Sequence, residues 1–167
     1  MADEDRDNVL NKLLLNAART DNVDQLLDEV FSKPGEFDIN YQDGIGNTAL
    51  HYAASVGSVE VLNELLEYED CDVDYTNHLE GATPLHLAVK IKGPELRAFI
   101  VDSLLDAGAD TRIKDKAGQV PLDYVLEDDT ETRNAFRRHQ AINSISAADV
   151  DDDDDEDEEY SESDEEE

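Results

Sequence analysis

Apolar residues recur three and four positions apart in three stretches of this chain, which is the spacing of one face of an α-helix. The stretches begin near residues 23, 59 and 96. A stripe of this kind must be buried against a neighbouring element. We therefore predict three amphipathic helices whose inward positions are Val23, Leu26, Leu27 and Val30 in the first; Val59, Leu62 and Leu66 in the second; and Leu96, Phe99, Ile100, Ser103 and Leu104 in the third.

A seven-residue segment occurs ahead of two of these stripes. Residues 48–54 read TALHYAA, and residues 83–89, which begin 35 positions later, read TPLHLAV. A weaker match at Leu122 follows Leu85 by 37 residues, and an Ala-Ala pair at residues 17–18 precedes the pair at 53–54 by 36. Self-similarity at such a period indicates stacked repeats. The chain is therefore predicted to contain four units.

The residues that flank the repeated segment fit the ends of short helices. Thr48 and Thr83 can accept a hydrogen bond from an N–H of the first turn. Pro84 is tolerated there because the N–H that it lacks would have no partner in the helix. Gly57 and Gly108 fall where the chain must stop a helix and reverse, at positions that often require a positive φ. Each unit is thus predicted to be a pair of helices joined by a turn.

Together, the repeated segment and the period resemble the ankyrin-repeat family over about residues 9–145. The resemblance implies an all-α solenoid of about four helix-turn-helix units with projecting β-hairpin fingers between them. The first and last units are expected to be caps, because a terminal repeat has a neighbour on one side only. The expected layout is an N-terminal extension of 1–8; a repeat domain of 9–148 with units 9–42, 43–77, 78–114 and 115–146; and a tail of 149–167.

Three units depart from the family pattern. The second unit is two residues longer than 33, around residues 69–71. The third unit is about four residues longer than the usual 33, around residues 91–94, and Lys92 stands where a glycine would end its first helix. The fourth unit has Asp123 where the histidine of the repeated segment would stand. Both insertions are expected in loops, and the weakened motif supports the assignment of the fourth unit as a cap.

The resemblance also implies where a partner binds, because ankyrin proteins use the fingers and the inner side of the first helices. Some of these positions can equally be solvated turn residues. Carried over position by position, the expected contacts are Gln42, Gly44, Ile45, Asn47, Ser55 and Val56 in the second unit; Leu79, Glu80, Ala82, Lys90 and Ile91 in the third; and Lys114, Lys116 and Gln119 in the fourth.

Charge narrows the class of partner. The 167 residues hold 44 Asp and Glu against 13 Lys and Arg, which gives a formal net charge of −31. Residues 149–167 contain 15 of the acids, so the body before them has 29 acids against the 13 bases. DNA, RNA and anionic lipid are bound by basic surfaces. We expect no nucleic-acid or membrane partner, and a protein partner rich in Lys and Arg.

Residues 149–167 are predicted to be a disordered acidic tail, because a segment with high like charge cannot bury enough apolar surface to offset its chain entropy. The tail can solubilise the chain, screen a basic partner, or dock on the basic cluster at residues 133–139. That cluster can instead stabilise the end of a helix through the macrodipole. Ser161 and Ser163 each have an acid three residues later and resemble sites of acidophilic kinases.

Neither catalysis nor cofactor binding is predicted. The resemblance implies that His51 and His86 hydrogen-bond neighbouring backbone and do not hold a metal. Residues 44–46 read GIG but lack the third glycine of a dinucleotide loop, and no nucleophile elbow, zinc-binding HExxH or phosphate-binding lysine loop occurs. Cys71 is the only cysteine, which excludes an internal disulfide and a thiolate zinc site. The expected cofactor and metal content is none.

Two functions remain open. The first is a non-catalytic adaptor or escort that binds a basic protein, such as a ribosomal or histone-like protein. The second is a regulatory subunit or assembly factor of a larger enzyme. Salt separates the two, because binding driven by charge weakens as ionic strength rises. The N-terminal residues lack the features of a secretory signal, so we expect the protein in the cytoplasm or nucleus. We also expect it to be a monomer by itself.

Overall fold

The computed structural model of the protein describes residues 2–152, with side chains described for residues 9–146. The described chain is all-helical and forms four successive two-helix units, as the repeated segment predicts. The pairs are α1 (Ala2–Thr20) with α2 (Val23–Gln25), which continues as the π-helix η1 (Leu26–Phe31); α3 (Ala49–Val56) with α4 (Val59–Glu67); α5 (Pro84–Ala88) with α6 (Pro94–Asp106); and the 3-10 helix η2 (Pro121–Tyr124) with α7 (Thr130–Asp152).

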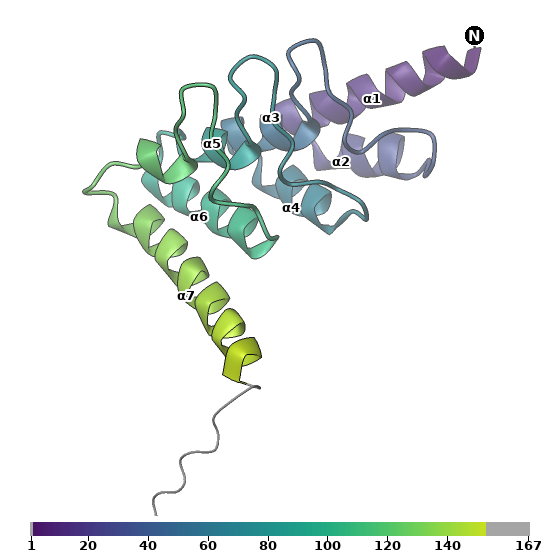
Figure 1. Cartoon of the computed structure of the whole chain (residues 1–167). Coiled ribbons are helices and arrows are strands. Elements are labelled where there is room, and N and C mark those ends of the chain that lie inside the picture. Colours follow the sequence, from purple (N-terminus) through teal and green to yellow (C-terminus); the bar gives the residue numbers. More distant parts are fainter. Residues whose placement is uncertain (1, 153–167) are drawn as a thin grey trace, which may run out of the picture.

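The units stack side by side and produce two layers of helices (Figure 1). Helices α1, α3, α5 and η2 contact one another in chain order and form the first layer. Helices α2, α4, α6 and α7 follow the same order in the second layer. Every unit therefore contacts only its neighbours along the stack, which is the arrangement of a solenoid.

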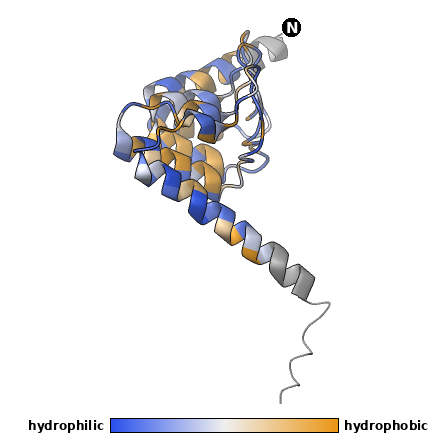
Figure 2. Cartoon of the chain, turned by 60° about the vertical axis from the view of Figure 1, so that its left-hand side comes forward, coloured by the Kyte–Doolittle hydropathy of each residue, from blue (hydrophilic) through white to orange (hydrophobic). Residues whose placement is uncertain are grey.

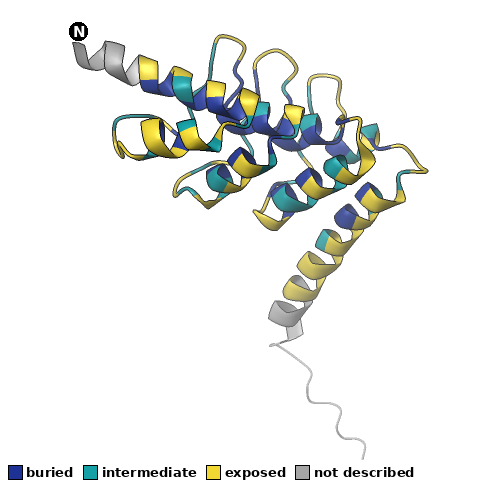
Figure 3. Cartoon of the chain, turned by 180° about the vertical axis from the view of Figure 1, so that it is seen from behind, coloured by how far each residue is buried: buried dark blue, intermediate teal, exposed yellow. Residues whose placement is uncertain are grey.

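Small side chains in the first layer allow the helices to lie close together. Ala17 and Ala18 in α1, Ala53 and Ala54 in α3 and Ala88 in α5 are all fully buried. Larger apolar residues fill the space between the two layers, where Figure 2 shows orange segments gathered and Figure 3 shows dark blue ones. The alanine pairs that reveal the period in the sequence thus form the contact between units.

Buried histidines join consecutive units. The Nδ1 atom of His51 accepts the Thr48 N–H at 3.1 Å, which leaves the ring proton on Nε2, and Nε2 lies 2.9 Å from the Ala82 carbonyl oxygen of the next unit. His86 repeats this geometry with Thr83 and with the Gln119 carbonyl oxygen, at 3.1 and 2.9 Å. The backbone role expected for both histidines is confirmed.

The fourth unit receives a histidine bond and passes none onward. The Asp123 carboxylate accepts the Val120 N–H at 3.0 Å and so replaces the Nδ1 atom of a histidine. A carboxylate has no N–H to donate to a following unit. The segment forms only the short η2, and α7 covers the end of the stack against α6. These features are those of a cap.

Several boundaries differ from the sequence expectations. Residues 2–8 belong to α1 and residues 149–152 belong to α7. Because α7 extends to Asp152, the basic residues 133–139 lie inside the helix, and the prediction that they mark its end is wrong. Arg133 donates instead to the Val125 carbonyl at 2.7 Å, and Arg138 pairs with Asp102 at 2.9 Å. The rest of the expected tail, residues 153–167 with Ser161 and Ser163, lies outside the described residues.

An arginine anchors the insertion of the third unit. Arg97 in α6 donates through Nη1 to the Ile91 carbonyl at 2.5 Å, within the loop that carries the extra residues. Its Nε lies 2.7 Å from an Asp129 carboxylate oxygen, and the two side chains are only 16% and 7% exposed. Asp129 also accepts the Thr132 N–H of the first turn of α7 at 3.1 Å. Arg97 therefore ties the insertion to the start of the capping helix.

We predict that His51→Gln lowers the free energy of unfolding and makes that free energy less dependent on pH. Loss of a buried hydrogen bond is worth about 1–3 kcal/mol. Burial lowers the pKa of His51 below its usual 6.5, against the opposing hydrogen bond to Ala82, so the unfolded chain binds this proton more readily. The stability linked to His51 is present above pH ~6.5 and is lost as pH falls through the lowered pKa. Urea unfolding between pH 7.5 and 5 measures both effects. Equal pH slopes in wild type and variant would contradict this, and the exposed His78→Gln is the control.

We predict that Arg97→Met destabilises the protein by about 2 kcal/mol, because it leaves a mostly buried carboxylate and a loop carbonyl without their charged donor. Arg112→Met is the matched control, since its pair with Asp110 is exposed and should contribute little. Urea denaturation of both variants at pH 7 tests the difference. The prediction fails if the two variants unfold at the same urea concentration.

Candidate functional site

Three loops project from the first-helix layer and form the fingers of the molecule (Figure 1). They comprise residues 43–47, 77–82 and 115–119. No β-strand occurs in them or elsewhere in residues 2–152, so the expected β-hairpins are hydrogen-bonded turns without strand pairing. Each finger is closed by a backbone bond from its first N–H to its last carbonyl: Asp43 to Asn47 at 3.0 Å, Asn77 to Ala82 at 2.9 Å, and Asp115 to Gln119 at 2.9 Å.

The first side chain of each finger also binds the loop backbone. Asp43 Oδ1 accepts the Ile45 and Asn47 N–H groups at 3.1 and 3.0 Å. Asp115 and Asn77 each accept two N–H groups of their own loops in the same way, although the finger of Asn77 is one residue longer. Asp and Asn favour such turns because their short side chains reach the backbone two residues on. The fingers are therefore preorganised loops.

Adjacent fingers are bonded to each other. The His78 N–H donates to the Ile45 carbonyl and the Lys116 N–H donates to the Glu80 carbonyl, both at 2.8 Å. Gly46 permits the first contact: its φ is +87°, and a Cβ there would lie 2.4 Å from the His78 nitrogen. The three fingers consequently form one continuous surface, and we call this surface, with the exposed side of α1, α3, α5 and η2, the inner face.

Two tyrosines on the inner face share one arrangement. The hydroxyl of Tyr52 in α3 donates to Asp43, and that of Tyr124 in η2 donates to Asp115 at 2.5 Å. A cation from the preceding unit covers each ring: the Arg19 guanidinium carbon lies 4.2 Å from the Tyr52 ring centroid, and the Lys90 ammonium lies 4.5 Å from that of Tyr124. Each ring is thus fixed at its edge and capped on one face.

Carboxylates complete both arrangements. Arg19 lies 3.7 Å from Asp43, and Lys90 lies 3.7 Å from Glu80. Hydrogen bonding from Tyr124 and from backbone N–H groups lowers the pKa of Asp115, and the same bond raises the pKa of Tyr124 to about 12. Burial opposes a similar lowering at Asp43, but the Tyr52 hydroxyl, two N–H groups and Arg19 outweigh it. Both finger carboxylates are therefore held ionised at neutral pH.

Most of the predicted contact residues lie exposed on the inner face or the fingers. The apolar ones are Ile45, Val56 and Leu79, with exposed fractions of 44%, 52% and 63%. Gln42 is half-buried and donates to the Gly46 and Thr76 carbonyls, so it also supports the fingers. The other exposed positions are Gly44, Ser55, Glu80, Lys90, Lys114, Lys116 and Gln119.

Three of the predicted contact residues are buried. Asn47 accepts the Asn77 side-chain amide at 2.9 Å and links two fingers. Ala82 is fully buried and supplies the carbonyl that faces His51. Ile91 belongs to the core because the insertion of the third unit turns it inward beside Arg97. These three side chains support the surface and are not available to a partner.

Sequence reasoning included Lys90 but missed the other cation, Arg19, and both rings, Tyr52 and Tyr124. A signal for the tyrosines exists, because Asp43 and Tyr52 are nine residues apart, as are Asp115 and Tyr124. The third unit hides that signal, since Asn77 and Leu87 occupy its corresponding positions. The cation partners are not visible in sequence, because Arg19 lies 33 residues before Tyr52 in a different unit.

The negative charge of the body does not lie on the inner face. The three fingers together with Arg19, Lys90, Lys114 and the exposed Asp123 of η2 contain four carboxylates and four cations. By contrast, residues 23–31 and 59–67 of the second layer contain six acids and no Lys or Arg. The turn that follows α4 adds Glu69, Asp70, Asp72 and Asp74. The inner face is thus nearly neutral within an acidic body.

Within the residues that the structure describes, no group of three or more His, Cys, Asp or Glu side chains could hold a metal ion. A hollow of about 770 Å³ lies between α7 and the turn at 108–112, but it is wide open and lined by polar side chains such as His139 and Asp110. Burial and Asp72 raise the pKa of Cys71 to about 12, so its thiol is unreactive. Among helices of the described chain, none has the length and apolarity required to cross a bilayer.

Comparison with known proteins gives the same assignment as the structure. A family model described as "Ankyrin repeats (3 copies)" matches residues 13–115. The ankyrin repeat-containing protein YGL242C of Saccharomyces cerevisiae is 36% identical over 132 residues, which cover 73% of this chain and 72% of that protein.

Two relatives are matched over less than half of their own length. The "Probable 26S proteasome regulatory subunit p28" of S. cerevisiae is 39% identical over 84 residues, which cover 50% of this chain and 35% of that subunit. The regulatory protein NPR5 of Arabidopsis thaliana is 41% identical over 77 residues, which cover 46% of this chain and 15% of that protein.

Ankyrin repeats are protein–protein interaction modules. The family match spans more than half of the chain, and the histidine bonds, alanine contacts and stacked fingers are those of consecutive repeats. The chain belongs to the ankyrin-repeat family.

Proposed function

We propose that this protein is a non-catalytic adaptor or escort that binds a basic protein, such as a ribosomal or histone-like protein. The observation that carries the proposal is the separation of charge from the inner face. The ordered inner face is nearly neutral, whereas helices α2 and α4 of the second layer and the sequence of residues 149–167 are densely acidic. The protein would act as a monomer in the cytoplasm or nucleus.

The acidic surface supplies long-range attraction. Charges on the second layer and in residues 149–167 create a field that steers basic proteins and repels nucleic acid. Such a field increases association rates more than it increases final affinity, and salt screens it. A basic client would therefore be captured quickly and held by contacts of another kind.

The inner face supplies those contacts. Ile45, Val56 and Leu79 expose apolar surface on a platform that is rigid before binding, since the fingers are closed by their own hydrogen bonds. Preorganised loops lose little entropy when a partner binds. Tyr52 and Tyr124 add aromatic surface, the kind that dominates binding energy at protein interfaces. A basic protein with an exposed apolar segment fits both parts of the surface.

A second candidate is a regulatory subunit or assembly factor of a larger enzyme complex. Its support is the likeness of half of this chain to the yeast protein named as a proteasome regulatory subunit. Binding would then rest on shape and apolar contacts at the inner face, and the acidic residues would have little effect.

We predict that a basic client is bound at least tenfold more weakly at 0.3 M than at 0.05 M salt, because screening shortens the reach of the acidic field. Affinity capture with the full chain as bait, read by mass spectrometry, should enrich ribosomal or histone-like proteins. A variant in which the acids of 153–167 become their amides keeps the length of the chain and should lose most of this enrichment.

The control for that capture is Leu79→Ser, which removes apolar surface and leaves the charge unchanged. It should weaken binding at both salt concentrations by the same factor. If bound proteins are not enriched in basic ones, and neither salt nor the amide variant matters, the escort is excluded. A flat salt response with a strong Leu79→Ser effect favours the regulatory subunit.

We also propose that Ser161 and Ser163 are phosphorylated by acidophilic kinases of the casein-kinase-II type. Each phosphate adds about −1.5 to −2 charge to an acidic segment. Treatment of the full chain with such a kinase should add two phosphates and tighten binding of a basic client severalfold at low salt. A Ser161→Ala, Ser163→Ala variant that gains phosphate to the same extent would refute this assignment.

A further inference from the structure

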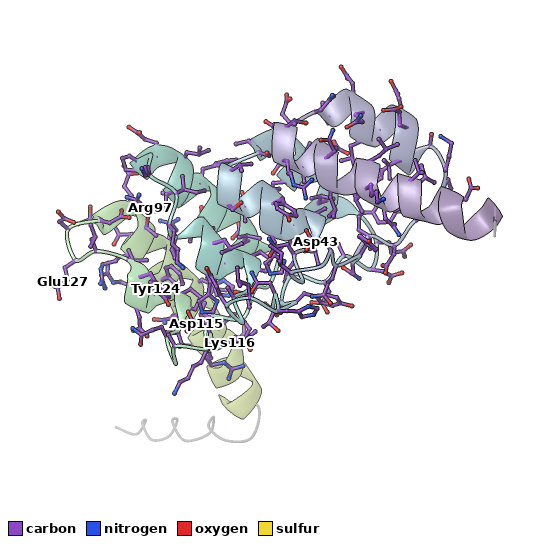
Figure 4. The ribbon with its side chains drawn as sticks, turned by 90° about the horizontal axis from the view of Figure 1, so that it is seen from above. Asp43, Arg97, Asp115, Lys116, Tyr124 and Glu127 are labelled. Atoms are coloured by element: carbon purple, nitrogen blue, oxygen red, sulfur yellow. The ribbon has the colours of Figure 1, made fainter. Side chains whose placement is uncertain are left out.

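A hollow of about 340 Å³ opens on the inner face between the third and fourth units. Its walls come from two fingers, from η2 and from Lys90, which follows α5. One wall is apolar, since Leu79 is the most exposed apolar residue of the inner face. In Figure 4, Asp115, Lys116 and Tyr124 lie together at this end of the molecule, away from Asp43. The residues that line the hollow include Leu79, Glu80, Lys90, Asp115, Lys116 and Tyr124.

The side chains around the hollow favour a cation. Tyr124 lines the hollow, the Lys90 ammonium lies over its ring, and the bond from its hydroxyl to Asp115 fixes the ring. Glu80 places a carboxylate at the rim. Lys90 of this chain is a cation that already occupies this position. Its ammonium lies 4.5 Å from the Tyr124 ring centroid and 3.7 Å from Glu80. The quadrupole of an aromatic ring attracts a cation to the ring face, and the negative charge of a neighbouring carboxylate adds to that attraction.

Lys90 is held weakly. Its side chain is 41% exposed, that of Glu80 is 47% exposed, and exposed pairs of this type are individually weak. The flexible lysine stem can swing into solvent at low cost, since α5 has already ended when the chain reaches residue 90. The ring can therefore exchange its cation for one supplied by a partner.

The second tyrosine shows which cation suits such a place. At Tyr52 the cation is an arginine, whose guanidinium carbon is 4.2 Å from the ring centroid and which lies 3.7 Å from Asp43. A guanidinium is planar, stacks on rings, binds carboxylates with two N–H groups and is less strongly hydrated than an ammonium. One face of the Tyr52 ring is already covered by Arg19 of this chain. The hollow beside Tyr124, by contrast, has room for an added side chain.

We propose that the Tyr124 hollow is an arginine-binding subsite for a protein partner. An arginine of the partner stacks on the Tyr124 ring in place of Lys90, pairs with Glu80, and lays its apolar stem against Leu79. This inference rests on the proposed function, because the acidic body attracts the basic segment that delivers the arginine. It adds a chemical preference that charge alone does not provide, since a field does not distinguish arginine from lysine.

Two synthetic peptides test the subsite with the full chain. Both are fluorescent decamers of five glycines alternating with five basic residues, one with arginine and one with lysine. Fluorescence anisotropy at 0.05 M salt should show the arginine peptide bound about threefold more tightly by the wild-type protein. Tyr124→Leu and Glu80→Gln should reduce that ratio to about one, while Lys90→Ala should tighten binding of the arginine peptide.

Tyr52→Leu is the matched control, because it removes the other ring of the inner face and should leave the ratio unchanged. Glu80→Gln and Lys90→Ala alter exposed side chains only, so they test the subsite even if Tyr124→Leu unfolds the last unit. Equal affinities for the two peptides in wild type, or a ratio that survives both Tyr124→Leu and Glu80→Gln, would overturn the subsite. Absence of salt-sensitive binding to either peptide would instead overturn the proposed function.

Discussion

The fold depends on a buried ring nitrogen that faces a carbonyl oxygen of the next unit. His51 and His86 each satisfy the N–H at the start of their own helix with one nitrogen and the backbone of the following finger with the other. The bond sets the spacing between units, and the buried alanine pairs allow that spacing. Since the accepting carbonyls belong to Ala82 and Gln119, at the ends of two fingers, the same interaction holds the proposed binding surface in place.

The inner face inherits its rigidity from these bonds. Each finger is closed by its first side chain, and the second and third fingers are each bonded to the finger before them. A tyrosine then links the helix of the unit to the finger carboxylate in the second and fourth units. Because the third unit has Asn77 and Leu87 at these places, it supplies apolar surface between two tyrosines. The surface is therefore ordered at both ends and apolar in the middle.

The sequence predicts well those features whose residues all lie within one unit. The helix starts at Thr48 and Thr83 follow from local spacing. The predicted stripes are correct at Leu26, Leu62 and Leu104, which are buried, but wrong at Leu27 and Phe99, which are 39% and 47% exposed. Features that join different units are not visible in that way. Arg97 finds Asp129 across 32 residues, and Arg19 finds Tyr52 across 33. Ile91 occupies an exposed position in a standard repeat, but the insertion that Arg97 anchors turns it into the core.

The Tyr124 hollow has a thermodynamic consequence because its walls belong to two units. Leu79, Glu80 and Lys90 come from the third unit, whereas Asp115, Lys116 and Tyr124 come from the fourth. In a linear array of repeats, the end unit has one neighbour and opens first. A side chain seated in the hollow touches both units, so it binds only while the end unit is closed, and by mass action it stabilises that state. Occupancy of the hollow and order of the C-terminal cap are therefore linked equilibria, each of which favours the other.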